Sequence, residues 1–131
     1  MGKIITILGF FIIILGINVS CEKKEAYKKE LQTESYKIVV VSEKPPFVGV
    51  NKWKIYLYDK NGKPITDAKV GVNGYMPPMP GMPEMSFDYP VKKVKDHYES
   101  DVNLNMGGTW QITITVEKNG KKEKAKFGFN L

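Results

Sequence analysis

From about residue 35 to the C-terminus, apolar and polar side chains alternate with a period of two. In "NKWKIYLYD", Trp53, Ile55 and Leu57 fall on one side, and lysine and tyrosine side chains fall on the other. Successive side chains of a β-strand point to opposite faces of its sheet, so this pattern predicts strands with one buried face. A chain built almost wholly from such segments is expected to bury its core between sheets.

Seven segments carry the alternation: "SYKIVVVS", "NKWKIYLYD", "TDAKVGVNGY", "MSFDYPVKKV", "HYESDVNLNM", "TWQITITVE" and "KKEKAKFGFN". Asn-Gly pairs such as Asn119-Gly120 supply turn signals between them. Pro90 interrupts the fourth segment, which is tolerated only at a sheet edge or a bulge. We therefore predict an all-β fold, an immunoglobulin-like antiparallel β-sandwich of about seven strands. A Greek-key barrel is the alternative, and Trp53 and Trp110 are expected in the core of either.

The N-terminal segment differs from the rest of the chain. Lys3 is followed by "IITILGFFIIILGI", an apolar run with the length of a secretory h-region, which is short for a membrane-spanning helix. The run leads into "NVSC", and the small residue Ser20 before Cys21 resembles a bacterial lipoprotein signal, in which the cysteine is lipidated after cleavage. We predict a signal peptide over residues 1–20 and lipid attachment at Cys21. An uncleaved anchor helix with a free thiol is the alternative.

Cys21 is the only cysteine, so the folded part cannot contain an internal disulfide and depends on its apolar core. The next residues, "EKKEAYKKELQTES", are charged and have few apolar side chains. This composition predicts a solvated tether over residues 21–34. Residues 35–131 remain for the β-sandwich domain, which is long enough to enclose a small core.

The charged residues of the chain also indicate which classes of partner are expected. All 20 cationic side chains are lysine, and the net charge is +6. Proteins that read nucleic acids depend on arginine for bidentate contacts with bases, so we predict no nucleic-acid partner. We interpret the lysines as a solubilising surface that is also attracted to anionic headgroups.

Three segments, in this order, resemble the YtkA-like family, which is related to the FixH-like proteins: "PFVGVNKWKIYLYDKNGKPITDAKV", "MPPMPGMPEM" and "HYESDVNLNMGGTWQITITV". The shared features are an Asn-x-aromatic pair, a D-x-x-G-K-P turn, an A-x-V strand, a Met-Pro loop and an M-x-G-x-W start of a strand. The matching residues outside the loop are Asn51, Trp53, Asp59, Gly62, Lys63, Pro64, Ala68, Val70, Met106, Gly108 and Trp110.

The resemblance implies a membrane-attached, extracytoplasmic, immunoglobulin-like β-sandwich without catalytic residues. Several relatives are linked to copper handling, heavy-metal efflux or the assembly of copper-containing oxidases. Many members carry a histidine in the Met-Pro loop, whereas "MPGMPEM" has none.

The Met-Pro loop places Met76, Met79, Met82 and Met85 three residues apart, with prolines between them. Proline-rich backbone favours the polyproline II form, whose three residues per turn would stack these side chains along one edge. Neighbouring methionine Cα atoms would then lie about 9 Å apart. A single metal ion would require the loop to bend, and Gly81 is where it can.

Three interpretations of this loop stay open. Soft thioethers select Cu(I), which would make the loop a metal site. Alternatively, the flexible methionines fill gaps over aromatic residues, or they form a surface for a partner protein. The candidate ligands are Met79, Met82 and Met85, with Met76, Met106 or His97 completing the set.

His97, the only histidine, lies in "VKDHYES" and is interpreted as a surface residue. Asp96 is adjacent, but no nucleophile motif accompanies the pair, and the sequence lacks a phosphate loop, a CxxC pair and an HExxH motif. We therefore expect no enzyme activity. The sequence favours an exported, lipid-anchored interaction or accessory protein of a membrane complex, for example in metal efflux or oxidase assembly. A Cu(I)-handling protein that uses the Met-Pro loop is the alternative.

Overall fold

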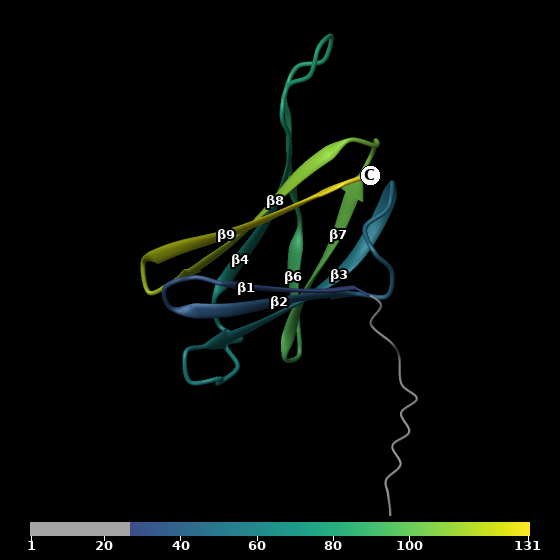
Figure 1. Cartoon of the computed structure of the whole chain (residues 1–131). Helices are drawn as coiled ribbons and strands as arrows, with labels where there is room; N and C mark the ends of the chain where they lie inside the picture. The colour runs from purple at the N-terminus through teal and green to yellow at the C-terminus, as the bar shows by residue number, and fades with distance from the viewer. Residues whose placement is uncertain (1–26) are drawn as a thin grey trace, which may run out of the picture.

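The computed structural model describes residues 27–131, which form two antiparallel sheets packed face to face (Figure 1). One sheet has the strand order β1-β2-β3-β7-β6, and the other has the order β5-β4-β8-β9. The strands are β1 (Tyr27–Gln32), β2 (Tyr36–Ser42), β3 (Gly49–Asp59), β4 (Lys69–Met76), β5 (Met85–Tyr89), β6 (Val91–Val94), β7 (His97–Leu104), β8 (Thr109–Lys118) and β9 (Lys121–Asn130). The predicted immunoglobulin-like β-sandwich is therefore confirmed, with two strands more than expected.

The first additional strand is β1, and it corrects the predicted tether. Residues Tyr27–Gln32 pair with β2, from Tyr27 opposite Ser42 to Gln32 opposite Lys37, so the prediction of a solvated tether is wrong for this part. Tyr27 and Leu31 pack against the core, while the charged residues of this edge strand remain exposed. Two inward apolar residues are a weak sequence signal for a strand. The predicted signal peptide, Cys21 and the rest of the tether lie outside the described residues.

The second additional strand arises at Pro90. This residue separates β5, at the edge of one sheet, from β6, at the edge of the other. Proline cannot donate a hydrogen bond to a strand ladder, and here the chain leaves one sheet and joins the other. The carbonyl of Pro90 accepts a hydrogen bond of 2.8 Å from the Ser100 hydroxyl. The predicted edge position of Pro90 is thereby confirmed.

The core follows the period-two pattern closely. All four inward residues of β8 are fully buried: Trp110, Ile112, Ile114 and Val116. Trp53 of β3 is 1% exposed, and its ring lies 5.8 Å from that of Phe127 on the facing sheet. The predicted core positions of Trp53 and Trp110 are confirmed.

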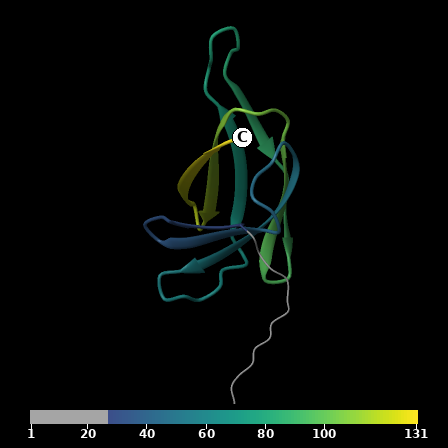
Figure 2. The same ribbon diagram turned by 45° about the vertical axis from the view of Figure 1, so that its right-hand side comes forward.

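Three connections share one end of the sandwich, which we call the loop end. Gly49 at the start of β3 pairs with Leu104 at the end of β7, which places the β2–β3 loop (43–48) beside the β7–β8 loop (105–108). Tyr75 near the end of β4 pairs with Gln111 near the start of β8. The β4–β5 connection (77–84) therefore lies at the same end as the β7–β8 loop. Figures 1 and 2 show this last connection projecting beyond the sheets.

A buried carboxylate joins the two sheets at the opposite end. Glu123 of β9 is 9% exposed, and its Oε1 accepts a hydrogen bond of 2.9 Å from the Ser35 backbone N–H in the β1–β2 turn. Its Oε2 lies 3.4 Å from the ammonium of Lys121. Hydrogen bonding by Ser35 and Thr33 lowers the pKa of Glu123 to about 2.

We expect Trp110→Ala to lower the free energy of unfolding by about 3 to 5 kcal/mol, because it leaves a large cavity between the sheets. That loss is a large share of the stability of a small domain. Urea denaturation measures the difference, with Gln111→Ala, an exposed neighbour on the same strand, as the control. A Trp110→Ala protein as stable as the parent would contradict the inward placement of this side chain.

We expect Glu123→Gln to flatten the acid dependence of stability. The folded-state pKa of Glu123 lies below its usual value of 4.5, so its stabilising effect is complete above that value and is lost as the pH falls through about 2. Glutamine does not titrate there. Urea denaturation across this pH range should therefore show a smaller loss for the variant than for the parent. Parallel stability curves would show that Glu123 does not favour its ionised form in the folded state.

Candidate functional site

The four methionines of the Met-Pro loop lie on a tight hairpin. The β4–β5 ladder ends with Met76 opposite Met85, and the same register continues to Met79 opposite Met82. The Met79 and Met82 backbones exchange hydrogen bonds of 2.9 and 2.8 Å. Between them, a Pro-Gly pair closes the turn, with Gly81 at a φ of 80°, as a type II turn requires. The expected bend at Gly81 is confirmed.

The same geometry corrects the expectation of an extended polyproline II edge. We call residues 76–85 the Met hairpin. Its methionines form two cross-strand pairs, one at each end of the proline-containing segment, and do not stack along a single edge. Backbone hydrogen bonding across the hairpin selects this form, because a strand ladder satisfies polar groups that polyproline II leaves to water.

The side chains of Met76 and Met79 meet over Gly108. A Cβ atom built on Gly108 would lie 2.8 Å from the methyl carbon of Met76 and 3.9 Å from that of Met79. Gly108, at a φ of 131°, therefore leaves the space that these two methionines share. Met76 is 1% exposed and Met79 is 39% exposed, whereas Met82 and Met85 are half-buried. The Met hairpin thus has a buried base and an accessible tip.

Aromatic residues lie beneath the base of the Met hairpin. The ring of Phe87 lies 6.0 Å from that of Trp110, and Met85 and Met106 pack against the same core. The Trp110 indole donates a hydrogen bond of 3.0 Å to the Met106 carbonyl. This arrangement supports gap filling for Met76, Met85 and Met106. The tip methionines remain available for a metal ion or a partner.

His97 is not brought to the methionines. It lies at the start of β7, opposite Val94, and about seven residue steps of strand, roughly 23 Å, separate it from the loop end. Its ring nitrogens lie 3.1 Å from Asp96 and 2.9 Å from Glu99, and hydrogen bonding with His97 lowers the pKa of both carboxyls. The expectation that His97 completes a ligand set with the Met-Pro loop is wrong, because β7 points it to the opposite end.

Within residues 27–131, no group of three or more histidine, cysteine, aspartate and glutamate side chains is arranged to hold a metal ion. Across the same residues, no helix is long and apolar enough to cross a membrane.

Asn51 was not predicted as a structural residue, yet it organises the β2–β3 loop. It is 1% exposed, and its Oδ1 accepts a hydrogen bond of 3.1 Å from the Phe47 N–H. Its Nδ2 donates to the carbonyls of Phe47, Gly49 and Val102 at 2.9, 3.0 and 3.3 Å. The signal that could have found it is a polar residue at an inward position of a strand, since such a group is buried only with hydrogen-bond partners.

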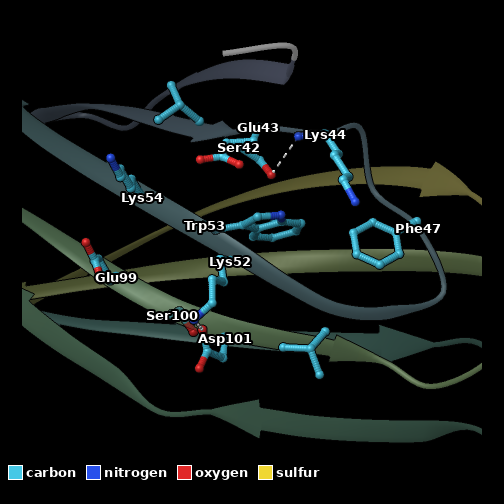
Figure 3. Close-up of a pocket in the computed structure, with 12 residues that line it drawn as sticks. Ser42, Glu43, Lys44, Phe47, Lys52, Trp53, Lys54, Glu99, Ser100 and Asp101 are labelled. Atoms are coloured by element: carbon cyan, nitrogen blue, oxygen red, sulfur yellow. Dashed lines mark hydrogen bonds and ion pairs between the residues drawn. The ribbon is translucent and has the colours of Figure 1, made fainter. Parts of the chain in front are cut away.

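Exposed apolar side chains also mark the loop end. In the part of the chain that the structure describes, the exposed large hydrophobic residues are Phe47, Val48, Val50 and Met79. Three of the four belong to the β2–β3 loop or the adjoining start of β3. A groove of about 330 Å³ lies beside them, and Figure 3 shows Lys44, Phe47, Lys52, Trp53 and Asp101 along it.

The comparisons with known proteins agree with this architecture. The model of the YtkA-like family matches residues 30–115, so the chain belongs to the YtkA-like family. Among solved structures, it is similar to FetP from the uropathogenic Escherichia coli strain F11, which was recombinantly expressed in the periplasm of E. coli. That similarity has a TM-score of 0.52 at 9% identity and covers 80% of this chain and 95% of FetP, which supports the fold alone. No curated protein matches the chain.

Proposed function

We propose that this chain is a non-enzymatic accessory module, anchored by lipid at Cys21 to the extracytoplasmic side of a membrane. In this proposal it presents the Met hairpin to a membrane protein complex. The membership of the YtkA-like family and the lipoprotein-like segment before Cys21 support the setting. The form of the Met hairpin supports the role of contacting a membrane complex.

The observation that carries the proposal is the form of the Met hairpin. Its backbone continues the β4–β5 ladder, so its tip is preorganised and extends beyond the sandwich (Figure 2). Met79 at the tip is 39% exposed. Exposed, flexible methionines adapt to apolar surfaces of different shapes, which suits a contact with a partner. A preorganised contact also loses less conformational entropy on binding.

A second candidate function is Cu(I) handling at the same hairpin. The observation that favours it is the approach of the Met76 and Met79 methyl groups over Gly108, with Met82 and Met85 opposite them across the ladder. A donor set of thioethers fits a soft monovalent copper ion and disfavours hard cations such as Mg²⁺. If copper binds, Met79 and Met82 at the tip would hold it, with Met76 beside Met79.

We expect Cys21→Ser to abolish lipid labelling of the full chain and to move the protein out of the membrane fraction. The reason is that the thiol of Cys21 is the only one in the chain available for the thioether link to lipid. Fractionation of cells with metabolic lipid labelling measures both effects, with Ser20→Ala as a control that keeps a small residue before the cysteine. Unchanged membrane retention of the Cys21→Ser protein would instead favour an uncleaved anchor helix.

We expect Met79→Leu with Met82→Leu to weaken Cu(I) binding if the second candidate is correct. Leucine keeps the apolar volume, so the free energy of unfolding should change by less than about 1.5 kcal/mol. A Cu(I) competition titration on the full chain in detergent measures the affinity, with Val48→Leu outside the hairpin as the control. Thioethers do not titrate, so binding by the parent should persist at mildly acid pH. Equal, weak binding by parent and double variant would rule out copper handling at this site.

A further inference from the structure

The β2–β3 loop is an apolar tip that the fold holds in a fixed shape. Phe47 is 38% exposed, and Val48 and Val50 are each 53% exposed. The four hydrogen bonds of Asn51 fix the backbone behind them. Gly49 has a φ of 135°, and a Cβ there would lie 3.0 Å from the Phe47 ring. The buried Asn51 thus holds three exposed apolar side chains together on one loop, and such a group of apolar side chains is typical of an interaction site.

Polar donors lie in the groove beside this tip. The Trp53 indole N–H is buried and has no hydrogen-bond partner among the described residues. In Figure 3, the indole nitrogen faces the side of the groove formed by Ser42 and Lys44. The Lys44 ammonium lies 5.3 Å from the centroid of the Phe47 ring. An unpaired buried donor is costly, so an acceptor oxygen brought to this position would be stabilised.

The carboxylates of the groove lie mainly along β7. Asp101 forms an ion pair with Lys52 at 3.5 Å. Glu99 hydrogen-bonds His97 and pairs across the ladder with Lys54. Glu43 also lines the groove, next to Lys44 in sequence. Two of the three carboxylates are therefore matched by cations at the end of the groove away from Phe47.

The position of the N-terminal strand brings this groove close to the predicted anchor. Tyr27, the first described residue, pairs with Ser42, which itself lines the groove. Six residue steps separate Cys21 from Tyr27, and they span at most about 22 Å when fully extended. This short connection contains Lys23 and Lys24. A lipid chain on Cys21 would hold Tyr27 within that distance of the bilayer surface, with Ser42 and the start of the β2–β3 loop one strand further on.

We propose that the β2–β3 loop and its groove form a membrane-docking surface that receives an anionic phospholipid headgroup. Phe47, Val48 and Val50 enter the interfacial region, and Lys44 and the Trp53 N–H face the phosphate. Lysines near an anionic leaflet are attracted to it, and apolar side chains add to the binding. This inference rests on the proposed lipid anchor and adds an orientation to it.

The test uses the lipidated full chain, reconstituted into vesicles of phosphatidylcholine with or without phosphatidylglycerol. Because Cys21 is the only native cysteine and carries the lipid in the lipidated chain that is used, Val48→Cys provides a single thiol for an environment-sensitive fluorophore. Lys122→Cys, an exposed position beside the β8–β9 turn, is the matched control. We expect quenching of the Val48 probe by iodide to fall several-fold on phosphatidylglycerol vesicles relative to detergent, while quenching of the Lys122 probe stays unchanged.

A charge variant tests whether Lys44 contributes to docking on anionic lipid. Lys44→Gln, combined with the Val48 probe, should reduce the protection from iodide, whereas Lys63→Gln in the β3–β4 loop should not. Equal quenching of the Val48 and Lys122 probes on vesicles would overturn the docking surface. Equal protection of the Val48 probe on neutral and anionic vesicles would overturn the anionic headgroup.

Flotation of the vesicles separates the two proposals. Protein that floats with the vesicles but leaves the Val48 probe open to iodide would retain the anchor and lose the docking surface. Protein that does not float would overturn the anchor and, with it, the membrane-facing orientation. Protection that arises only in native membranes, and not in pure lipid, would assign the β2–β3 loop to a protein partner and overturn the lipid site.

Discussion

The burial of one face of β8 is the constraint on which the rest of the structure depends. Its four inward side chains are fully buried against the facing sheet, and β8 pairs with β4 on one side and β9 on the other. The period of a strand is two, so a shift of one residue would expose Trp110 and its three inward neighbours together. The register of β4 is therefore fixed by β8, and the position of the Met hairpin follows from the register of β4.

The sequence predicted most of the fold because its signal is periodic. Trp53 and Trp110 lie where the alternation places them, and Pro90 lies between two edge strands, where its missing N–H is tolerated. The signal failed at β1, where the edge strand needs only Tyr27 and Leu31 to face the core. An edge strand is fixed largely by backbone pairing with its neighbour, which composition does not reveal.

The candidate site was predicted in its residues but not in its geometry. The three-residue spacing was enough to identify the four methionines as candidate ligands. The choice between a polyproline II edge and a hairpin, however, depends on backbone pairing across Gly81. Whether His97 joins them depends on which end of β7 it occupies, which is a property of topology. The space shared by Met76 and Met79 exists because Gly108 on another loop lacks a side chain. Contacts between distant segments of this kind have no local sequence signal.

The loop end links the two proposed surfaces through a single arrangement of strands. Antiparallel pairing of β1 with β2 brings the N-terminus of the described chain to Ser42, beside the β2–β3 loop. Pairing of β3 with β7 and of β4 with β8 places the Met hairpin at the same end. Figures 1 and 2 show the Met hairpin projecting at the top of the sandwich and β1 crossing its lower half, so an anchor before β1 would confine the hairpin to the membrane surface without holding its tip against the bilayer. Confinement of the chain to the membrane surface suits partners in the same membrane, because the effective concentration of the contact rises without additional binding area.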